Sequence, residues 1–279
     1  MTEVFDIVNG VQVARTPAAL RELLAPKEVL ALDTMRTLRP EITSKYTDCF
    51  LLRFAYARKY DPTRAVELLA NYEQLLLKYD IESPWSFDPL KQYFDSGVYA
   101  MSPYVRDRRG RPVMYVRARA FPLISGPDGI DLRRYVRFAM WYLDIMFTWG
   151  GIAAYREPVT MVEDFTDVSL TAMTGSIKTS QMKELMADMQ DHIPMRLGQI
   201  FLVDPPWFFR VLYAIVRPFL KQKLRKKFVL TTREKLREFI DEDNIPEYLG
   251  GRGTFHKPEF VDELKAMHPQ LSHGEFLAV

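Results

Sequence analysis

The sequence predicts an α/β protein with a helical N-terminal part, and three observations lead to this prediction. Apolar residues recur at spacings of three and four through 18–39 and 47–79, as they do on one face of a helix. From 111 onward, segments of strand composition alternate with helical ones, the pattern of a mainly parallel sheet covered by helices. Between the two parts, 83–89 is rich in proline and serine, which favours a domain boundary.

The N-terminal part, 1–85, is predicted to be a compact helical bundle. Phe50 and Phe54 fall on one helical face of this region. Asp61 followed by Pro62 is a strong helix start, because a carboxylate can cap free backbone N–H groups and proline suits the first helical position.

The second part, 86–254, carries the alternating elements, and 255–279 is interpreted as a C-terminal tail. Four strands are expected, at 111–121, 157–168, 198–206 and 227–232. Four helices are expected, at 131–147, 179–193, 207–220 and 233–240.

Charge is spread unevenly along the chain. The total of 38 Lys and Arg against 36 Asp and Glu gives a net charge of only +2, which gives no reason to expect a nucleic-acid partner. Residues 196–237, however, hold eleven basic residues and two acids, a local charge of +9 that leaves −7 for the remainder. This asymmetry predicts one face that meets an anionic surface.

Catalytic and metal-binding patterns are absent from the sequence. Cys49 is the only cysteine and the four histidines are scattered, so neither a disulfide nor a thiolate metal site is expected. No nucleophile elbow, phosphate-binding loop or dinucleotide glycine motif occurs. The acids Glu163, Asp164 and Asp167 are spaced too irregularly to indicate a catalytic pair. We therefore expect a protein without cofactor or metal that is not an enzyme.

Localisation is predicted from what the chain lacks. Its start has neither the basic end nor the apolar run of a signal peptide. No segment reaches the roughly 18 apolar residues of a membrane-spanning helix. A cytoplasmic protein is expected.

The segment 207–220 is unusually apolar and runs directly into a cationic cluster. Its fourteen residues contain two charges, whereas the next seven, 221–227, contain five. On a helix, Arg210, Arg217 and Lys221 fall within a sector of roughly 40°, and apolar side chains occupy most of the remaining circumference. Three interpretations are open: a helix buried between core layers, an interfacial membrane helix, or a lid that covers an apolar cavity.

Five motifs, in order, resemble those of the CRAL-TRIO lipid-binding family, and the similarity spans roughly 47–254. The motifs are "LLRFAYARKYDPTRAVELLANYEQLLLKY" (51–79), "RRGRPVMYV", "IPMRLGQIFLVDPPWFF", "RPFLKQKLRKKFVL" and "IPEYLGG". The pattern is most similar to the branch of tocopherol and retinaldehyde carriers.

The resemblance implies a helical N-terminal lobe and an α/β lobe whose sheet floors an apolar pocket closed by a gate helix. By similarity, the pocket residues would be Trp141, Tyr142, Ile145, Val162, Phe165, Phe201 and Val203. The gate residues would be Trp207, Phe208, Phe209, Leu212, Ile215, Val216 and Phe219. Ordinary core packing remains an alternative for each pocket residue.

Two departures from the family pattern bear on the ligand. Met195 occupies the position where phosphatidylinositol exchangers have a headgroup-binding glutamate, and Asp167 stands where the family usually has glycine. The basic positions that bind phosphoinositide in the tocopherol branch are nevertheless basic here. The implied phosphoinositide-binding residues are Arg58, Lys59, Arg196, Lys221, Lys223, Arg225, Lys226 and Lys227.

The sequence thus predicts a carrier that binds a small tocopherol-, retinoid- or carotenoid-like lipophile and exchanges it at phosphoinositide-containing membranes, with which it associates reversibly. A phosphatidylinositol/phosphatidylcholine exchange protein, or a phosphoinositide-responsive adaptor whose pocket is structural, is the alternative. An enzyme acting on a lipophile is the least favoured.

Overall fold

The computed structural model describes residues 5–8, 11–14, 21–81, 91–149 and 156–256. The predicted boundary at 83–89 and nearly all of the predicted tail lie outside these residues. Two short strands near the N-terminus, β1 (Phe5–Val8) and β2 (Val11–Ala14), form an antiparallel hairpin.

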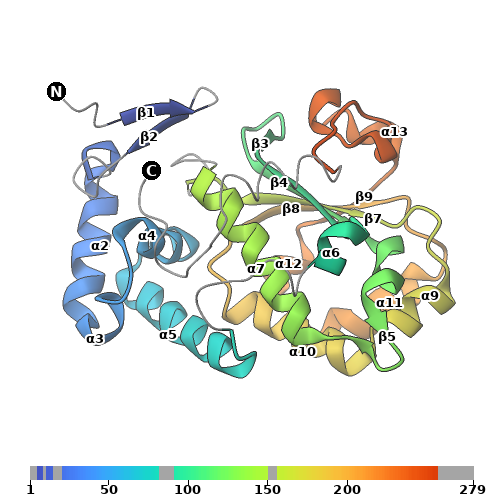
Figure 1. Cartoon of the computed structure of the whole chain (residues 1–279), viewed down its shortest axis with the longest axis horizontal. Coiled ribbons are helices and arrows are strands. Elements are labelled where there is room, and N and C mark those ends of the chain that lie inside the picture. Colours follow the sequence, from blue (N-terminus) through green and yellow to red (C-terminus); the bar gives the residue numbers. More distant parts are fainter. Residues whose placement is uncertain (1–4, 9–10, 15–20, 82–90, 150–155, 257–279) are drawn as a thin grey trace.

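The N-terminal lobe is helical, as predicted, and forms the left-hand part of Figure 1. Its helices are α2 (Pro26–Leu38), α3 (Pro40–Thr43), α4 (Asp48–Ala57) and α5 (Pro62–Lys78). Helix α5 begins at Pro62 because the Asp61 carboxylate accepts a hydrogen bond from the Arg64 N–H at 3.1 Å.

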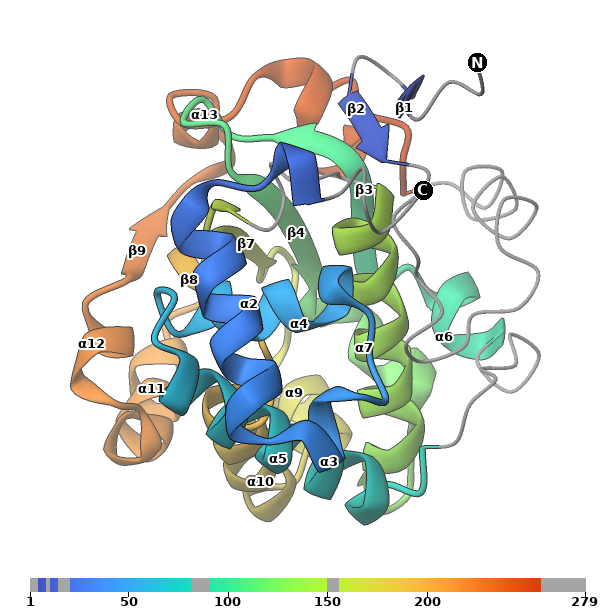
Figure 2. The same ribbon diagram turned by 90° about the vertical axis from the view of Figure 1, so that its left-hand side faces the viewer.

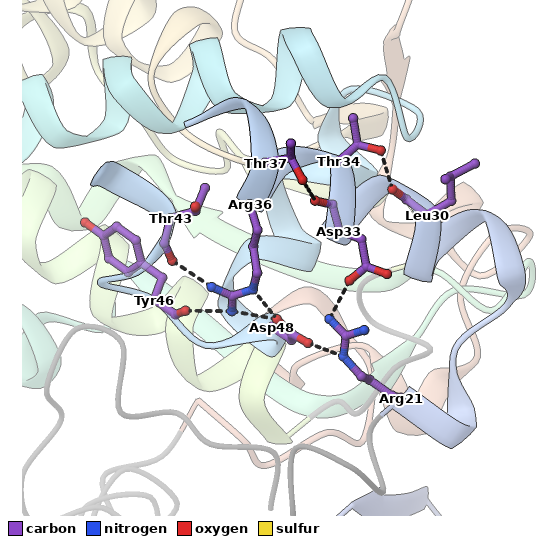
Figure 3. Close-up of polar contacts among 9 residues, drawn as sticks. All are labelled: Arg21, Leu30, Asp33, Thr34, Arg36, Thr37, Thr43, Tyr46 and Asp48. Atoms are coloured by element: carbon purple, nitrogen blue, oxygen red, sulfur yellow. Dashed lines mark hydrogen bonds and ion pairs between the residues drawn. The ribbon is translucent and has the colours of Figure 1, made fainter. Parts of the chain in front are cut away.

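A nearly buried carboxylate ties the first helices of this lobe together. Asp48, 9% exposed, accepts hydrogen bonds from Arg21 Nε at 2.7 Å and from Arg36 at 2.9 and 2.6 Å. The same Arg36 guanidinium donates to the carbonyls of Thr43 and Tyr46 (Figure 3). The chain between α2 and α4 is therefore fixed by one ionic network.

The α/β lobe is built on a five-stranded sheet in the order β3-β4-β7-β8-β9. The strands are β3 (Tyr99–Arg106), β4 (Pro112–Arg117), β7 (Val159–Asp164), β8 (Leu197–Val203) and β9 (Phe228–Thr231). All neighbours pair in parallel except β3, which runs antiparallel to β4. The four predicted strands are present, each shorter than expected, and β3 was not predicted.

Helices cover this sheet on the side that faces down in Figure 1. They are α6 (Lys91–Ser96), α7 (Leu132–Trp149), α9 (Leu170–Ser176), α10 (Thr179–Asp191), α11 (Phe209–Val216) and α12 (Gln222–Arg225). The opposite side carries α13 (Arg233–Leu236) and the short turns that follow it. A 3-10 segment, η2 (Ala118–Ile124), leads from β4 to the two-residue strands β5 (Ser125–Gly126) and β6 (Gly129–Ile130).

The predicted gate helix is shorter than expected. Helix α11 spans only Phe209–Val216, and residues Arg217–Phe219 form the 3-10 segment η3. Pro218 explains this change, because it lacks an N–H and its ring obstructs a continuing α-helix.

Each face of the sheet packs into its own hydrophobic cluster. The larger cluster joins the N-terminal lobe, α7 and one face of the sheet, and includes Met161 and Ile200. The smaller cluster lies under α13 and includes Val162 and Phe201. Successive residues of a strand point to opposite faces, so neighbours in β7 and β8 enter different clusters.

Two buried carboxylates fasten the lobes to each other. Glu28 of α2, 1% exposed, accepts from both Arg156 Nε (2.9 Å) and Tyr60 Oη (3.0 Å). Asp188 of α10 accepts from Tyr79 Oη at 2.6 Å and Lys78 Nζ at 2.8 Å. Figure 2 shows the N-terminal helices lying across the end of the sheet and beside α10.

Candidate functional site: an apolar cavity beside a cationic cluster

A cavity of about 360 Å³ lies between the sheet and the helices that cover it. Its floor is the face of the sheet that carries Met161, Glu163 and Phe165, and η2 and α7 close one end. One wall comes from α9 and α10, and α11 with η3 forms the opposite wall.

The wall formed by α9 and α10 is rich in methionine. Met182, Met186 and Met189 follow one another along α10 at spacings of four and three, so they share a helical face. Met161 and Met173 also line the cavity. Methionine side chains are flexible and polarisable, so this lining can adapt its shape to an apolar molecule.

Glu163 is the only acid among the described residues that line the cavity. Its carboxylate has no hydrogen-bond or ion-pair partner within the described part of the chain. Burial raises the pKa of Glu163 to about 7, because an apolar surrounding penalises the charged form. The carboxyl group therefore keeps its proton below about pH 7, and in that form it can donate a hydrogen bond.

Two buried tyrosines supply further polar atoms at the cavity. Tyr99 of β3 and Tyr135 of α7 both line it, and their hydroxyls lie 2.6 Å apart, with either able to donate. Burial raises the pKa of Tyr135 well above its usual range, and the nearby Glu163 adds to this effect. One hydroxyl hydrogen of the pair remains available for a further acceptor.

The structure corrects several of the predicted pocket positions. Val162, Phe201 and Val203 do not line the cavity, because they point to the opposite face of the sheet and belong to the smaller cluster. Met161 and Glu163 of β7 line the cavity instead, and of the two residues proposed in this region, Val162 and Phe165, Phe165 is the one that lines it.

The predicted residues of α7 also lie away from the cavity. Trp141 and Tyr142 are buried against Phe94 of α6, with ring centroids 4.6 and 5.4 Å apart, and are not among the lining residues. The side chain of Ile145 lies outside the described residues. Among the α7 residues whose side chains are described, Tyr135, two turns before Tyr142, lines the cavity.

Gate residues divide between the inside and the outside of the molecule. The cavity wall contains Phe209, Ile215, Val216 and Phe219. Phe208 is buried in the core and Trp207 is 82% exposed. The side chain of Leu212 lies outside the described residues.

The outer surface of the gate carries its own apolar stripe. Trp207, Val211 and Ile215 are spaced four residues apart and are 82%, 60% and 44% exposed. Val211 and Ile215 lie one turn apart on α11, Trp207 precedes the helix, and Ile215 borders both the solvent and the cavity. We call these three residues the outer stripe. Exposed Arg210 and Arg217 flank it.

Cationic side chains gather where β4, β8 and β9 begin. Burial lowers the pKa of Lys227, and the neighbouring charges of Arg196, Arg111 and Lys59 lower it further. None of these four forms an ion pair with a described acid. We call Lys59, Arg111, Arg196 and Lys227 the strand-end cluster.

Arg111 was not singled out from the sequence, although it stands in the recognised motif "RRGRPVMYV". Its guanidinium nitrogen lies 3.0 Å from the point that a Cβ at Gly198 would occupy. Gly198 is the glycine of "PMRLG", and a side chain at this position would require the Arg111 guanidinium to shift by a few tenths of an ångström. Arg196, in turn, stacks on the ring of Tyr56 at 4.5 Å.

The remaining predicted cations lie near this cluster with different partners. Burial lowers the pKa of Arg58, Arg64 adds to the lowering, and the nearby Asp191 opposes it. Lys221 pairs with Asp191, and Arg225 Nε donates to the Leu220 carbonyl at 2.8 Å. Lys223 and Lys226 are exposed on and after α12.

The two departures from the family motif are both accommodated. Asp167 adopts a φ of +57°, the left-handed conformation that glycine favours, and aspartate is among the few other residues that visit it. Met195 packs against the larger hydrophobic cluster.

Neither a membrane-spanning helix nor a metal centre is found in the described ranges. Every helix there is too short or too polar to cross a bilayer. No three potential ligands among His, Cys, Asp and Glu come together in those ranges.

The fold and the cavity define a class: an α/β protein whose sheet and covering helices border a mainly apolar cavity. The CRAL/TRIO domain profile matches residues 97–251, more than half of the chain. The chain therefore belongs to the CRAL/TRIO family, whose members bind and transfer lipids.

Relatives support the same family at modest identity. The mouse (Mus musculus) protein called alpha-tocopherol transfer protein-like is 27% identical over 229 residues, which cover 81% of this chain and 64% of the relative. Human (Homo sapiens) clavesin-2 is 27% identical over 240 residues, covering 81% and 68%. The chain thus spans just under two thirds of the mouse relative.

A solved structure supports the fold alone. The crystal structure of Sfh5 matches with a TM-score of 0.51 at 14% identity and covers 87% of this chain and 98% of Sfh5.

Proposed function

We propose that the chain is a non-enzymatic carrier of one small lipophile and exchanges it at phosphoinositide-containing membranes. The observation that carries this proposal is the cavity of about 360 Å³, whose described lining is mostly apolar and whose charged residues are Glu163, Lys178 and Lys183. Transfer of a lipophile from water into such a space is favourable by about 25 cal/mol per Å² of apolar surface.

The size of the cavity favours a tocopherol-, retinoid- or carotenoid-like ligand over a two-chain phospholipid. Its volume lies near the lower end of the ~300–1,000 Å³ typical of ligand pockets. Met195 supports the same choice, since an apolar side chain cannot hold an inositol headgroup as a glutamate does.

Glu163 and the tyrosine pair would select a ligand with one hydrogen-bonding oxygen. A neutral Glu163 can donate to a carbonyl or hydroxyl oxygen, and the free hydroxyl hydrogen of the Tyr99–Tyr135 pair offers a second donor. A wholly apolar ligand would leave these groups unsatisfied, which lowers its affinity.

The cations would bind the phosphates of a membrane phosphoinositide. The strand-end cluster and Arg58 would form one part of the site, and Lys221, Lys223, Arg225 and Lys226 the other. Supporting this, the strand-end cluster has no acidic partner among the described residues, and each basic residue near an anionic leaflet contributes about 1 kcal/mol.

The outer stripe would enter the bilayer beside these headgroups. Exposed tryptophan and branched apolar residues flanked by arginine are the composition of interfacial helices. The protein would accordingly be cytoplasmic and associate with membranes reversibly.

The test is native mass spectrometry of the purified full chain, followed by solvent extraction of whatever co-purifies. One isoprenoid-like lipophile per chain, or an empty cavity that accepts retinol stoichiometrically, supports the carrier. A stoichiometric phospholipid supports an exchange protein instead. A cavity that rejects both classes leaves a phosphoinositide-responsive adaptor.

A further inference from the structure

The cavity has a cationic rim at the start of α10. Lys178 directly precedes this helix and Lys183 lies one turn beyond Thr179, its first residue. All three residues line the cavity and are exposed to solvent. Thr179 and Lys183 are four residues apart, so they share one face of the helix. We call Lys178, Thr179 and Lys183 the rim.

The two rim lysines are free to bind an anion. Lys178 Nζ donates to the Pro127 carbonyl at 3.3 Å, and Lys183 Nζ lies 4.7 Å from the ring centroid of Phe219. Neither lysine forms an ion pair with an acid of the described residues. Each ammonium has three N–H groups, so donors remain for a ligand. Lys178 also stands at the amino end of α10, which attracts negative charge.

Beyond the rim, the wall of the cavity is apolar. Met182, Met186 and Met189 follow one another along α10. From Thr179 to Met189 the helix advances ten residues, which at about 1.5 Å per residue gives a wall of about 15 Å. An extended apolar chain can therefore lie along α10 with one end at the rim.

The acid of the cavity lies away from the rim. Burial raises the pKa of Glu163, and no basic group contributes to the shift. A nearby ammonium would lower this pKa, because an opposite charge favours the ionised carboxylate. The cavity thus has two polar regions, a cationic one at the rim and a carboxyl group on the sheet.

This arrangement fixes the direction in which an acidic ligand would bind. A ligand carboxylate placed deep in the cavity would lose its water and meet Glu163, and both effects disfavour the charged form. At the rim, the same carboxylate keeps part of its hydration and meets two ammonium groups. Its apolar chain then replaces water along the methionine wall.

We propose that the cavity binds an amphiphilic carboxylic acid, whose carboxylate lies between Lys178 and Lys183 and whose apolar chain runs inward along α10. This inference rests on the proposed carrier function and narrows its ligand class. It involves neither the strand-end cluster nor a membrane headgroup. A hydroxyl or carbonyl group further along the chain would meet the donors of Glu163 and of the Tyr99–Tyr135 pair.

The experiment measures binding to the full chain by quenching of tryptophan fluorescence, at about pH 7.5, where a free carboxylic acid is ionised. The probes are all-trans-retinoic acid, its methyl ester and all-trans-retinol, which share one isoprenoid body. The test variant carries Lys178→Gln together with Lys183→Gln. Lys235→Gln is the matched control, because Lys235 is an exposed lysine of α13, on the opposite side of the sheet.

Wild type should bind the acid about ten-fold more tightly than the ester, since each exposed ion pair contributes about two- to five-fold. Added salt should reduce this ratio. In the double glutamine variant the ratio should fall to about one. The ester is the internal reference, so a general change in the cavity cancels in the ratio. Lys235→Gln, and the charge-preserving double variant Lys178→Arg with Lys183→Arg, should keep the wild-type ratio.

Two results would overturn the proposal. One is equal affinity of wild type for acid and ester, and the other is an acid preference that survives in the double glutamine variant. Glu163→Gln checks the reverse orientation. It should keep the wild-type ratio, and a ratio that rises strongly there would place the carboxylate beside residue 163 instead of at the rim.

Straight-chain and isoprenoid acids are distinguished by palmitic acid and cetyl alcohol as competitors of the bound retinoid. Rim-dependent competition by palmitic acid alone includes fatty acids in the ligand class, and its absence restricts the class to isoprenoid acids. The proposed function fails differently. Retinol binding without an acid preference keeps the carrier and rejects the rim, rim-dependent binding of acids alone keeps both, and no binding of any probe rejects both.

Discussion

Replacement of Glu163 by glutamine should remove a pH dependence of stability that originates in the cavity. Glutamine keeps the shape and the hydrogen-bonding capacity of a neutral carboxyl group but cannot ionise. The other charged side chains that line the cavity are Lys178, at the start of α10, and Lys183 of α10, and the hydroxyls of Tyr99 and Tyr135 line it as well.

The magnitude follows from the pKa of Glu163, about 7 in the folded protein against the ordinary 4.5. At 1.36 kcal/mol per pH unit, this difference corresponds to about 3 kcal/mol. Because the folded state holds the proton more tightly than the unfolded chain, the contribution is fully present below pH 4.5. It is lost as the pH rises and is gone above about pH 7.

Urea unfolding followed by circular dichroism between pH 4 and pH 8 measures this effect. The free energy of unfolding of Glu163→Gln, minus that of wild type, should increase by about 3 kcal/mol across the window and then level off. The matched control is Glu238→Gln, which changes an exposed acid and should run parallel to wild type. Parallel curves for Glu163→Gln as well would refute a buried, proton-retaining carboxyl in the cavity.

Three further outcomes are expected. The triple variant Lys223→Ala, Arg225→Ala and Lys227→Ala should weaken binding to phosphoinositide vesicles about 100-fold, at about 1 kcal/mol per charge, while retinol affinity measured by fluorescence stays unchanged. Trp207→Ala should weaken vesicle binding about ten-fold in co-sedimentation without affecting retinol affinity, because this side chain is 82% exposed and does not line the cavity. Asp48→Asn should lower the free energy of unfolding, measured in urea, by about 2 kcal/mol. This loss is smaller than that expected for a fully buried ion pair, because the Arg21 and Arg36 side chains that Asp48 binds are 36% and 34% exposed.

Each of these expectations can fail in a recognisable way. Vesicle binding by the triple variant that matches wild type in both affinity and salt dependence would exclude these three cations as the membrane contact. Loss of retinol affinity in Trp207→Ala would mean that the gate conformation, rather than the outer stripe, had been altered. An unchanged free energy of unfolding in Asp48→Asn would show that the network in Figure 3 contributes nothing net to stability.

Local sequence rules predicted the type and position of the helices and strands better than the residues at which they end. The cap at Asp61 and Pro62 set the start of α5 correctly, because both residues act within one turn. The helix expected at 207–220 ended early at Val216, since Pro218 stops an α-helix even inside a favourable apolar pattern. Strand β3 was missed because Ser102 and Pro103 interrupt its apolar alternation.

The cationic site was predicted in composition but not in arrangement. Arg196 and Lys227 belong to a run of basic residues that is visible in the sequence. Arg111 lies far from that run in the chain and joins them only because β4, β7, β8 and β9 are parallel and begin at the same edge of the sheet.

The sequence by itself determined the order of helices and strands, the apolar gate and the cationic run after it, because these depend on neighbours along the chain. Only the tertiary structure decided which face of the sheet borders the cavity. Both faces of a covered parallel sheet are apolar, so the sequence pattern does not tell them apart. Val162 and Glu163 are adjacent in the chain, yet Val162 belongs to the smaller hydrophobic cluster and Glu163 lines the cavity. A one-residue difference in phase reverses the face, and packing of α10 and α11 on one side made Glu163 the acid of the cavity.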